Sequence, residues 1–153
     1  MPAHWLVRSQ VKERMVEILS STADVPVFRS FPPDWPDEAI WFGPTTGQLE
    51  YNVMGTNLPR DDRFSVVVVA HCHKPGNDPA EAESRAEEIA SFVLLTFAEY
   101  VRLDDEASDE FSILDALVTT IEGPDSVPHE NGEGWVAGLR LNVDIHLRIT
   151  RET

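Results

Sequence analysis

The sequence has few of the basic residues, long apolar runs and cysteines by which chains bind nucleic acids, enter membranes or form disulfide-stabilised folds. Its 153 residues include 12 basic against 27 acidic side chains, and the formal net charge is −15. This excess argues against binding nucleic acid through phosphate neutralisation and against docking on an anionic membrane. No apolar run approaches the roughly 20 residues of a membrane span, and the first residues lack the order of a signal peptide. Cys72 is the only cysteine, which excludes an internal disulfide and fits assembly inside a cell.

Recognisable catalytic motifs are missing as well. There is no Gly-x-Gly-x-x-Gly segment, no phosphate-binding Gly-Lys-Ser/Thr loop, and no serine in a nucleophile elbow. Cys72 stands between His71 and His73 in a predicted strand. Because side chains alternate along a strand, the thiol points away from both imidazoles, which argues against a Cys/His nucleophile pair.

The two histidines are the best candidates for a metal site. His71 and His73 lie two residues apart, so their rings share one face of the strand, and two imidazoles can bind zinc. His4, His129 or His146 would be the third ligand. No further ligand is adjacent in the sequence, so we interpret the pair as histidines at a strand end or a subunit contact. We expect no catalytic residue, no cofactor and no metal ion there.

Two segments have the spacing of amphipathic helices. Apolar residues recur every three or four positions over about 4–20 and about 79–101. The second helix has a clear start, because Asp78 can cap it, Pro79 suits its first position, and Glu81 stands where a capping-box acid belongs. With 42% hydrophobic residues the chain can bury a core, and we expect one domain over residues 1–153.

The first extended segments precede the middle of the chain. Residues 25–31 look extended, and Pro26 keeps them out of the centre of a sheet. Residues 39–42 and 48–54 then predict a hairpin around 43–47, a segment rich in glycine, proline and threonine.

Three further strands complete the predicted sheet. The four consecutive valines in 64–73 indicate a strand buried on both faces. Residues 113–122 follow as a strand, and 123–134 as a mobile hairpin tip. Apolar residues occupy every odd position of 135–149, a strand long enough to bend near Gly138 or to leave the domain and meet another subunit. The predicted fold class is therefore α/β (α+β): one domain with a mainly antiparallel sheet and two helices packed on it.

Polar residues of the last strand and two tryptophans are candidates for an interface. The even positions alternate in charge, which suits pairing with a neighbouring subunit, and tryptophan and arginine dominate interface energetics. The candidates are Trp35, Trp41, Arg140, Asp144, His146 and Arg148. Burial of Trp41 in the core, with the charged face merely solvated, fits the same pattern.

An acidic run lies between the second helix and the strand at 113–122. Its members are Asp104, Asp105, Glu106, Asp109 and Glu110. Such a run is ordinarily a solvated loop.

The order of elements resembles that of the tail terminator (minor tail U-type) proteins of long-tailed bacteriophages. The chain has a length near 150 residues, an amphipathic opening helix, and the stretch Phe31-Pro32-Pro33-Asp34-Trp35-Pro36 before the hairpin. The valine strand at 64–73, the helix capped at Asp78-Pro79, and an alternating C-terminal strand follow. The resemblance covers nearly the whole chain and is one of layout.

The resemblance implies a structural virion protein without catalysis or cofactor. It implies a homo-oligomeric ring, usually a hexamer, which is assembled in the host cytoplasm, caps the tail tube and joins it to the head-tail connector or stopper protein. Six copies at −15 each would carry −90, and the acidic run at 104–110 would form an acidic lumen through which genome DNA passes without tight binding. Another head-tail joining or tail-tube protein, an acidic monomeric binding module, and a small metalloenzyme using His71 and His73 are the alternatives.

Overall fold

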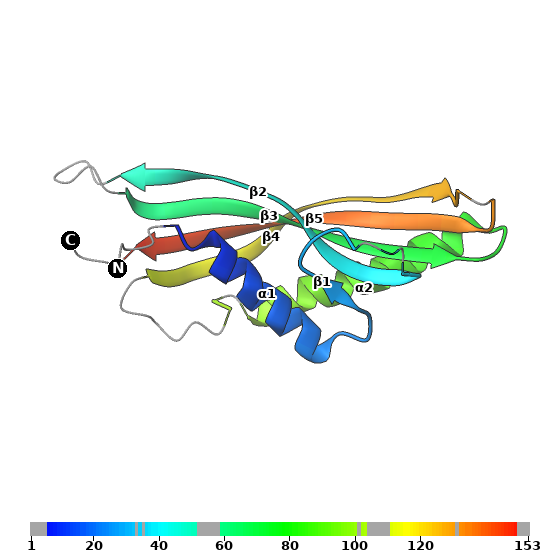
Figure 1. Ribbon diagram of the computed structural model, residues 1–153, viewed down its shortest axis with the longest axis horizontal. Helices are drawn as coiled ribbons and strands as arrows, with labels where there is room; N and C mark the ends of the chain where they lie inside the picture. The colour runs from blue at the N-terminus through cyan, green and yellow to red at the C-terminus, as the bar shows by residue number, and fades with distance from the viewer. Residues whose placement is uncertain are drawn as a thin grey trace.

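Within the described part of the chain, five strands and two helices follow one another (Figure 1). The computed structural model describes residues 6–32, 34, 36–51, 59–100, 102–103, 111–130 and 132–149. The elements are α1 (Arg8–Thr22), β1 (Val27–Phe28), β2 (Glu38–Tyr51), β3 (Pro59–Lys74), α2 (Pro79–Glu99), β4 (Phe111–Pro128) and β5 (Trp135–Ile149). Trp35, His4 and the acidic run at 104–110 lie outside the described residues.

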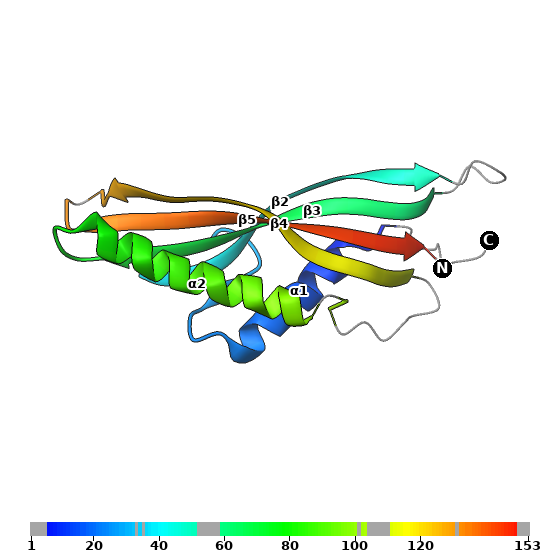
Figure 2. The same cartoon turned by 180° about the vertical axis from the view of Figure 1, so that it is seen from behind.

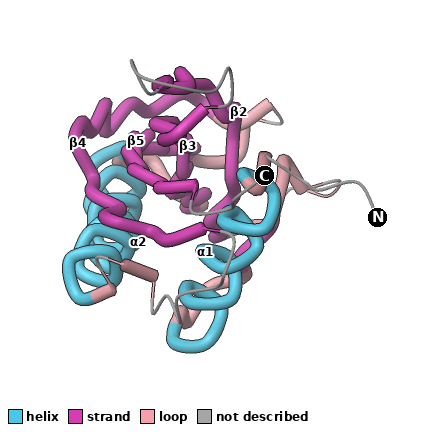
Figure 3. Tube along the Cα trace, turned by 90° about the vertical axis from the view of Figure 1, so that its left-hand side faces the viewer, coloured by secondary structure: helices cyan, strands magenta, loops and turns pink. Residues whose placement is uncertain are grey.

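The strands form a single sheet in the order β1-β2-β3-β5-β4. Among the described strands only the two-residue β1 pairs in parallel, with Ile40 and Trp41 of β2, and the other pairings are antiparallel. Both helices lie on the same side of this elongated sheet (Figures 1 and 2), as the view from one end also shows (Figure 3). The predicted α+β class with a mainly antiparallel sheet and two helices packed on it is confirmed.

The core lies between the helices and one face of the sheet. From β3 it takes Phe64, Val66, Val68, Ala70 and Cys72, and from β5 the odd positions from Ala137 to Leu147, all at most 5% exposed. The prediction that the valine strand is buried on both faces is wrong. Val67 and Val69 are only half-buried, because no described helix packs on their side of the sheet.

The predicted hairpin at 39–54 is also wrong, because Glu38–Tyr51 is one continuous strand. Its pairing with β3 shifts register between Phe42 and Thr45, so Gly43-Pro44 forms an irregularity within the strand instead of a turn. Proline is tolerated at such an irregularity and at a sheet edge, where its missing N–H breaks no ladder bond. The expected placement of the 25–31 segment at the margin of the sheet is confirmed by β1.

The start of α2 agrees well with the sequence pattern. The Asp78 Oδ1 atom accepts a hydrogen bond from the Ala80 N–H at 2.9 Å, and Pro79 occupies the first turn of α2. The Asp78 side chain thereby satisfies one of the N–H groups that have no partner within the helix. Pro79 has no N–H group, so none is left without a partner at its position. Within the described residues α1 begins at Arg8, four residues later than expected.

The ribbon of β4 and β5 is longer than predicted. β4 continues to Pro128, so half of the segment 123–134 expected as a mobile tip is strand, and its register shifts between Glu122 and Asp125, opposite Gly138. Two more shifts interrupt β4, between Ile113 and Asp115 and between Val118 and Thr120. β5 pairs along its length with both β3 and β4, so the alternative in which part of it leaves the domain is wrong.

Candidate functional site

One face of the sheet has no described helix over it, and we call it the uncovered face. It consists of the odd-numbered residues 61–73 of β3 and the even-numbered residues 136–148 of β5, with Trp41 and Glu50 of β2. Cross-strand pairing aligns these positions, for example Asp61 with Arg148 and Ser65 with Asp144. The structure thus brings together on one surface five of the residues that the sequence suggested for an interface: Trp41, Arg140, Asp144, His146 and Arg148.

The middle of the uncovered face combines apolar and polar side chains. Val67 and Val69 are half-buried, and Ser65 donates a hydrogen bond from its hydroxyl to the Asp144 carboxylate. Arg140 lies opposite Val69 on β3 and Glu122 on β4, and its side chain is exposed. Within the described part of the chain Arg140 forms no hydrogen bond or ion pair through its side chain, so its charge is available to another molecule.

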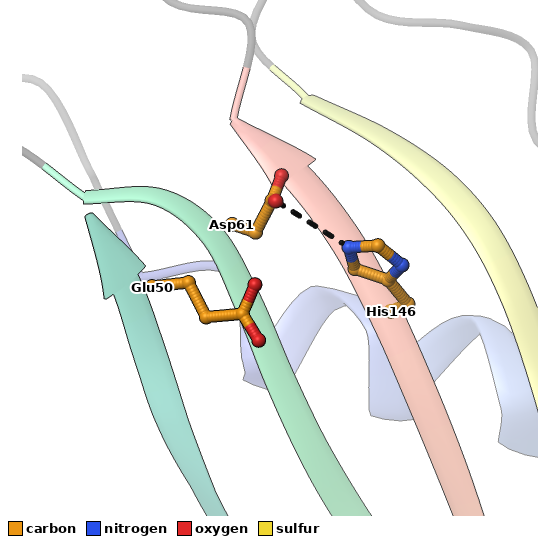
Figure 4. Close-up of side chains that lie close together, drawn as sticks. All are labelled: Glu50, Asp61 and His146. Atoms are coloured by element: carbon orange, nitrogen blue, oxygen red, sulfur yellow. Dashed lines mark ion pairs between the residues drawn. The ribbon is translucent and has the colours of Figure 1, made fainter. Parts of the chain in front are cut away.

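A compact cluster of charged groups lies at one end of this face (Figure 4). Arg148 donates from Nε to Asp61 Oδ1 at 3.1 Å, while His146 Nε2 lies 3.6 Å from Asp61 Oδ2. Glu50 is directly opposite Asp61 on the neighbouring strand and accepts from Arg63 Nε, with 2.6 Å to Glu50 Oε1. Ligand atoms of Glu50, Asp61 and His146 lie within 4.8 Å of one another.

Asp61 is the most deeply buried member of this cluster. Its side chain is 9% exposed, and that of His146 is 13% exposed. Burial alone would raise the pKa of the Asp61 carboxyl, but the hydrogen bond from Arg148 and the contact with His146 outweigh it and leave the pKa below its ordinary value. Asp61 is therefore a carboxylate at neutral pH, held in place by the Arg148 guanidinium.

A hollow of about 480 Å³ opens beside the cluster. Its lining includes Gln48, Arg63, Ser65, Asp144 and His146. The lining is mainly polar and opens to solvent, so the hollow has the character of a recess for water or a polar group more than of an apolar ligand pocket.

The opposite end of the uncovered face carries His71 and His73. The His73 Nδ1 atom lies 3.3 Å from Asp37 Oδ1, and Nε2 lies 2.8 Å from the Glu133 carbonyl oxygen. The ring also stacks on His129, with 4.3 Å between centroids. Both ring nitrogens of His73 thus have protein partners, which leaves neither directed at a shared ion with His71.

His71 is enclosed more fully than His73. It is 3% exposed, and its ring lies 5.2 Å from that of Trp41. Burial lowers the pKa of His71, and the nearby His73 lowers it further, against the opposing influence of a hydrogen bond to the backbone at Pro36 and of Asp37. Across the described residues no group of three potential metal ligands includes His71 or His73.

Cys72 faces the opposite side of the sheet, as strand alternation predicts. It is fully buried, and its thiol lies 3.9 Å from Glu38 Oε2. Burial, with Glu38 nearby, raises the pKa of the thiol to about 11. A thiol with this pKa stays protonated at neutral pH and is a poor nucleophile.

Trp41 is half-buried between two aromatic neighbours. Besides its contact with His71, its ring meets the edge of Phe31 at 5.3 Å between centroids. Trp41 is thus neither a core residue nor a freely projecting anchor. Trp35, the other candidate anchor, stays a prediction because it lies outside the described residues.

Sequence reasoning missed Glu50, Asp61 and Arg63 as members of a site. As a metal ligand, His146 was considered only together with His71 and His73, yet the register aligns it with Arg63, ten residues from His73 along β3. To predict this cluster from the sequence, one would have to know the register in which β2, β3 and β5 pair.

Comparisons with known proteins identify a fold. No protein-family profile matches the chain, and no curated protein sequence does. A chain of the "Virion of native gene transfer agent (GTA) particle" superimposes with a TM-score of 0.66 over 95% of this chain and 99% of its own length. The two sequences are 12% identical, so the likeness is one of fold. Among the described helices none is long and apolar enough to cross a membrane.

Proposed function

We propose that the chain is a structural subunit of a virion, located at the head-tail interface. The main support is the likeness to a virion chain, which extends over nearly the full length of both molecules. Since a gene transfer agent virion is a phage-like particle assembled from many protein chains, the same fold suits a subunit that works by binding other subunits. In this role the chain is not an enzyme.

The finer proposal is a tail terminator, a ring that caps the tail tube and joins it to the head-tail connector. The uncovered face supports it, because half-buried valines beside alternating charges suit a surface that another subunit covers. The free charge of Arg140 and the half-buried ring of Trp41 are the contacts that we assign to this interface. The ring is a hexamer in this proposal, and it is assembled in the host cytoplasm.

In this proposal the acidic run at 104–110 lines the lumen of the ring. A lumen of this sign repels DNA phosphates, so the genome passes through without tight binding. In the sequence the run follows α2 and precedes β4.

The experiment is native mass spectrometry of the purified chain, alone and after incubation with tail tubes, followed by electron microscopy of the tubes. We expect a closed ring of identical subunits on one end of each tube. A chain that stays monomeric even with tubes present would overturn the proposal.

The nearest alternative is another head-tail joining or tail-tube protein, and the same images distinguish it. A tail-tube protein stacks into long tubes by itself, whereas a head-closure protein binds the head connector and leaves the tubes bare. The metalloenzyme alternative at His71 and His73 has less support, because both nitrogens of His73 are engaged with the protein.

A further inference from the structure

The strongest unassigned feature is the meeting of Glu50, Asp61 and His146 at the end of the uncovered face (Figure 4). Each comes from a different strand, β2, β3 and β5, so a regular sheet brings them together. Glu50 and Asp61 form a direct cross-strand pair. Two carboxylates in this position repel each other, and a cation between them removes that cost.

The imidazole of His146 points at this pair with one nitrogen. Its Nε2 atom is buried, has no hydrogen-bond partner among the described residues, and lies 3.6 Å from Asp61 Oδ2. That separation is too long for a hydrogen bond. It is close to the roughly 3.4 Å between two ligands of one tetrahedral zinc ion with bonds of about 2.0–2.2 Å.

The neighbouring arginines leave an oxygen of each carboxylate for a metal. Arg63 binds Glu50 through Oε1, and Arg148 binds Asp61 through Oδ1. A carboxylate has two oxygens with about four lone-pair positions, so Glu50 Oε2 and Asp61 Oδ2 remain. The arginines then act as outer partners that orient the ligands, as hydrogen-bonded groups around metal sites commonly do.

We propose that Glu50, Asp61 and His146 bind a divalent transition-metal ion, for which Zn²⁺ is the probe. One imidazole nitrogen and two carboxylate oxygens are ligands that zinc accepts, whereas Mg²⁺ and Ca²⁺ prefer oxygen alone. This site is separate from the His71 and His73 pair and does not depend on the proposed tail-capping role.

The test is isothermal titration of the intact chain with Zn²⁺, repeated with Mg²⁺ and Ca²⁺. We expect one tight Zn²⁺ equivalent per chain and no comparable binding of the other two ions. Losing a zinc ligand costs more than losing an outer partner, which typically costs 10–100-fold, so His146→Ala and Glu50→Gln should each weaken Zn²⁺ binding by about 100-fold or more.

Two control variants match these changes elsewhere in the chain. His73→Ala removes a histidine at the other end of the sheet, and Glu87→Gln removes an exposed carboxylate on α2. Both should bind Zn²⁺ like the wild type. Circular dichroism checks the fold of every variant, and Glu50 is exposed, so Glu50→Gln stays informative if His146→Ala is unstable.

Three results would overturn the proposal. They are a wild type that binds no Zn²⁺, folded His146→Ala and Glu50→Gln variants that keep the tight equivalent, or binding that Mg²⁺ and Ca²⁺ reproduce, which would reflect only the high negative charge of the chain. None of these results bears on whether the chain forms a ring on tail tubes, so the two proposals fail independently.

Discussion

Arg8 in the first turn of α1 and Asp62 of β3 form a bidentate ion pair between helix and sheet. The Arg8 Nε atom donates to Oδ2 at 2.8 Å, and Nη2 donates to Oδ1 at 2.7 Å. Asp62 is 1% exposed on the side of the sheet that the helices cover, and the guanidinium also lies over the Phe64 ring. This contact raises the pKa of Arg8 and fixes where α1 crosses the sheet.

Removing Arg8 should therefore leave a buried carboxylate without its counter-charge. We expect Arg8→Ala to lower the free energy of unfolding by about 3 kcal/mol, the lower part of the range for breaking a buried pair, because the arginine is partly exposed. Chemical denaturation followed by circular dichroism measures this. Arg29→Ala is the control, since Arg29 and Glu13 are both about half exposed, and such a pair contributes under about 1 kcal/mol. Equal losses in the two variants would show that the Arg8–Asp62 pair has no special weight.

Gly47 of β2 allows an unusually close approach to β3. A Cβ atom there would overlap the Arg63 carbonyl oxygen and the Phe64 Cβ atom. We expect Gly47→Ala to force the strands apart and to lower the free energy of unfolding by about 2 kcal/mol, within the range of overpacking. The neighbouring, exposed Thr46→Ala should change it by under about 0.5 kcal/mol. If Gly47→Ala unfolds at the wild-type denaturant concentration, the strands do not approach this closely in solution.

His71 should make stability depend on pH in the mildly acidic range. Its pKa is lowered in the folded chain, so below the ordinary value of about 6.5 the unfolded chain binds a proton that the folded chain does not. Stability from this group is complete above that pH and falls as the pH decreases, by at most about 1.4 kcal/mol per unit. Denaturant titrations between pH 7.5 and 5 should show the decline.

The variant His71→Gln removes this titration. We expect it to flatten the pH dependence below about pH 6.5. If the free energy of unfolding has the same pH dependence in wild type and His71→Gln, other groups cause the acid sensitivity.

The proposed ring offers a charge-reversal test at Arg140. Breaking a desolvated interfacial charge costs roughly 2–5 kcal/mol, whereas a solvated surface change costs under about 0.5 kcal/mol. We expect Arg140→Glu to dissociate the ring while the subunit keeps its fold. Light scattering and circular dichroism measure this at matched concentration, with tail tubes present, and Arg102→Glu, an exposed residue outside the sheet, serves as control. A variant that still forms the ring and caps tubes would remove Arg140 from the interface.

Arg148, the other arginine among the interface candidates, is less suitable for a charge-reversal test. Arg148 binds the buried Asp61 within the same chain. Its reversal would place three negative side chains near one another and destabilise the subunit itself. Loss of a ring in that variant would not distinguish a broken interface from a damaged fold.

Where one face of an element is buried and the other is not, the sequence predicted the structure well. The alternation of 135–149 matches β5 from Trp135 to Ile149, because a shift of one residue would expose its entire apolar side. The Asp78-Pro79 start of α2 is likewise local, since both residues act on the first turn alone.

Glycine and proline led the prediction astray where they stand inside strands. Gly43-Pro44 and Gly123-Pro124 have the composition of turns, yet both lie at register shifts within long strands. The difference depends on pairing partners far along the chain, which no local pattern specifies. The same holds for the charged cluster, since Asp61 and His146 are 85 positions apart and meet only through the register of β3 with β5.

The three register shifts of β4 affect whether the sheets of two copies of this chain can pair edge to edge. β4 is at the margin of the sheet, and a long, regular marginal strand is a template for open-ended strand addition. Each shift breaks the repeat of outward N–H and C=O groups, and Asp115, Glu122 and Asp125 lie beside the breaks. The N–H and C=O groups of β4 therefore lack the regular spacing that a strand from another molecule needs for pairing. Such a strand would also meet charged side chains. Fibre growth along this margin is therefore disfavoured.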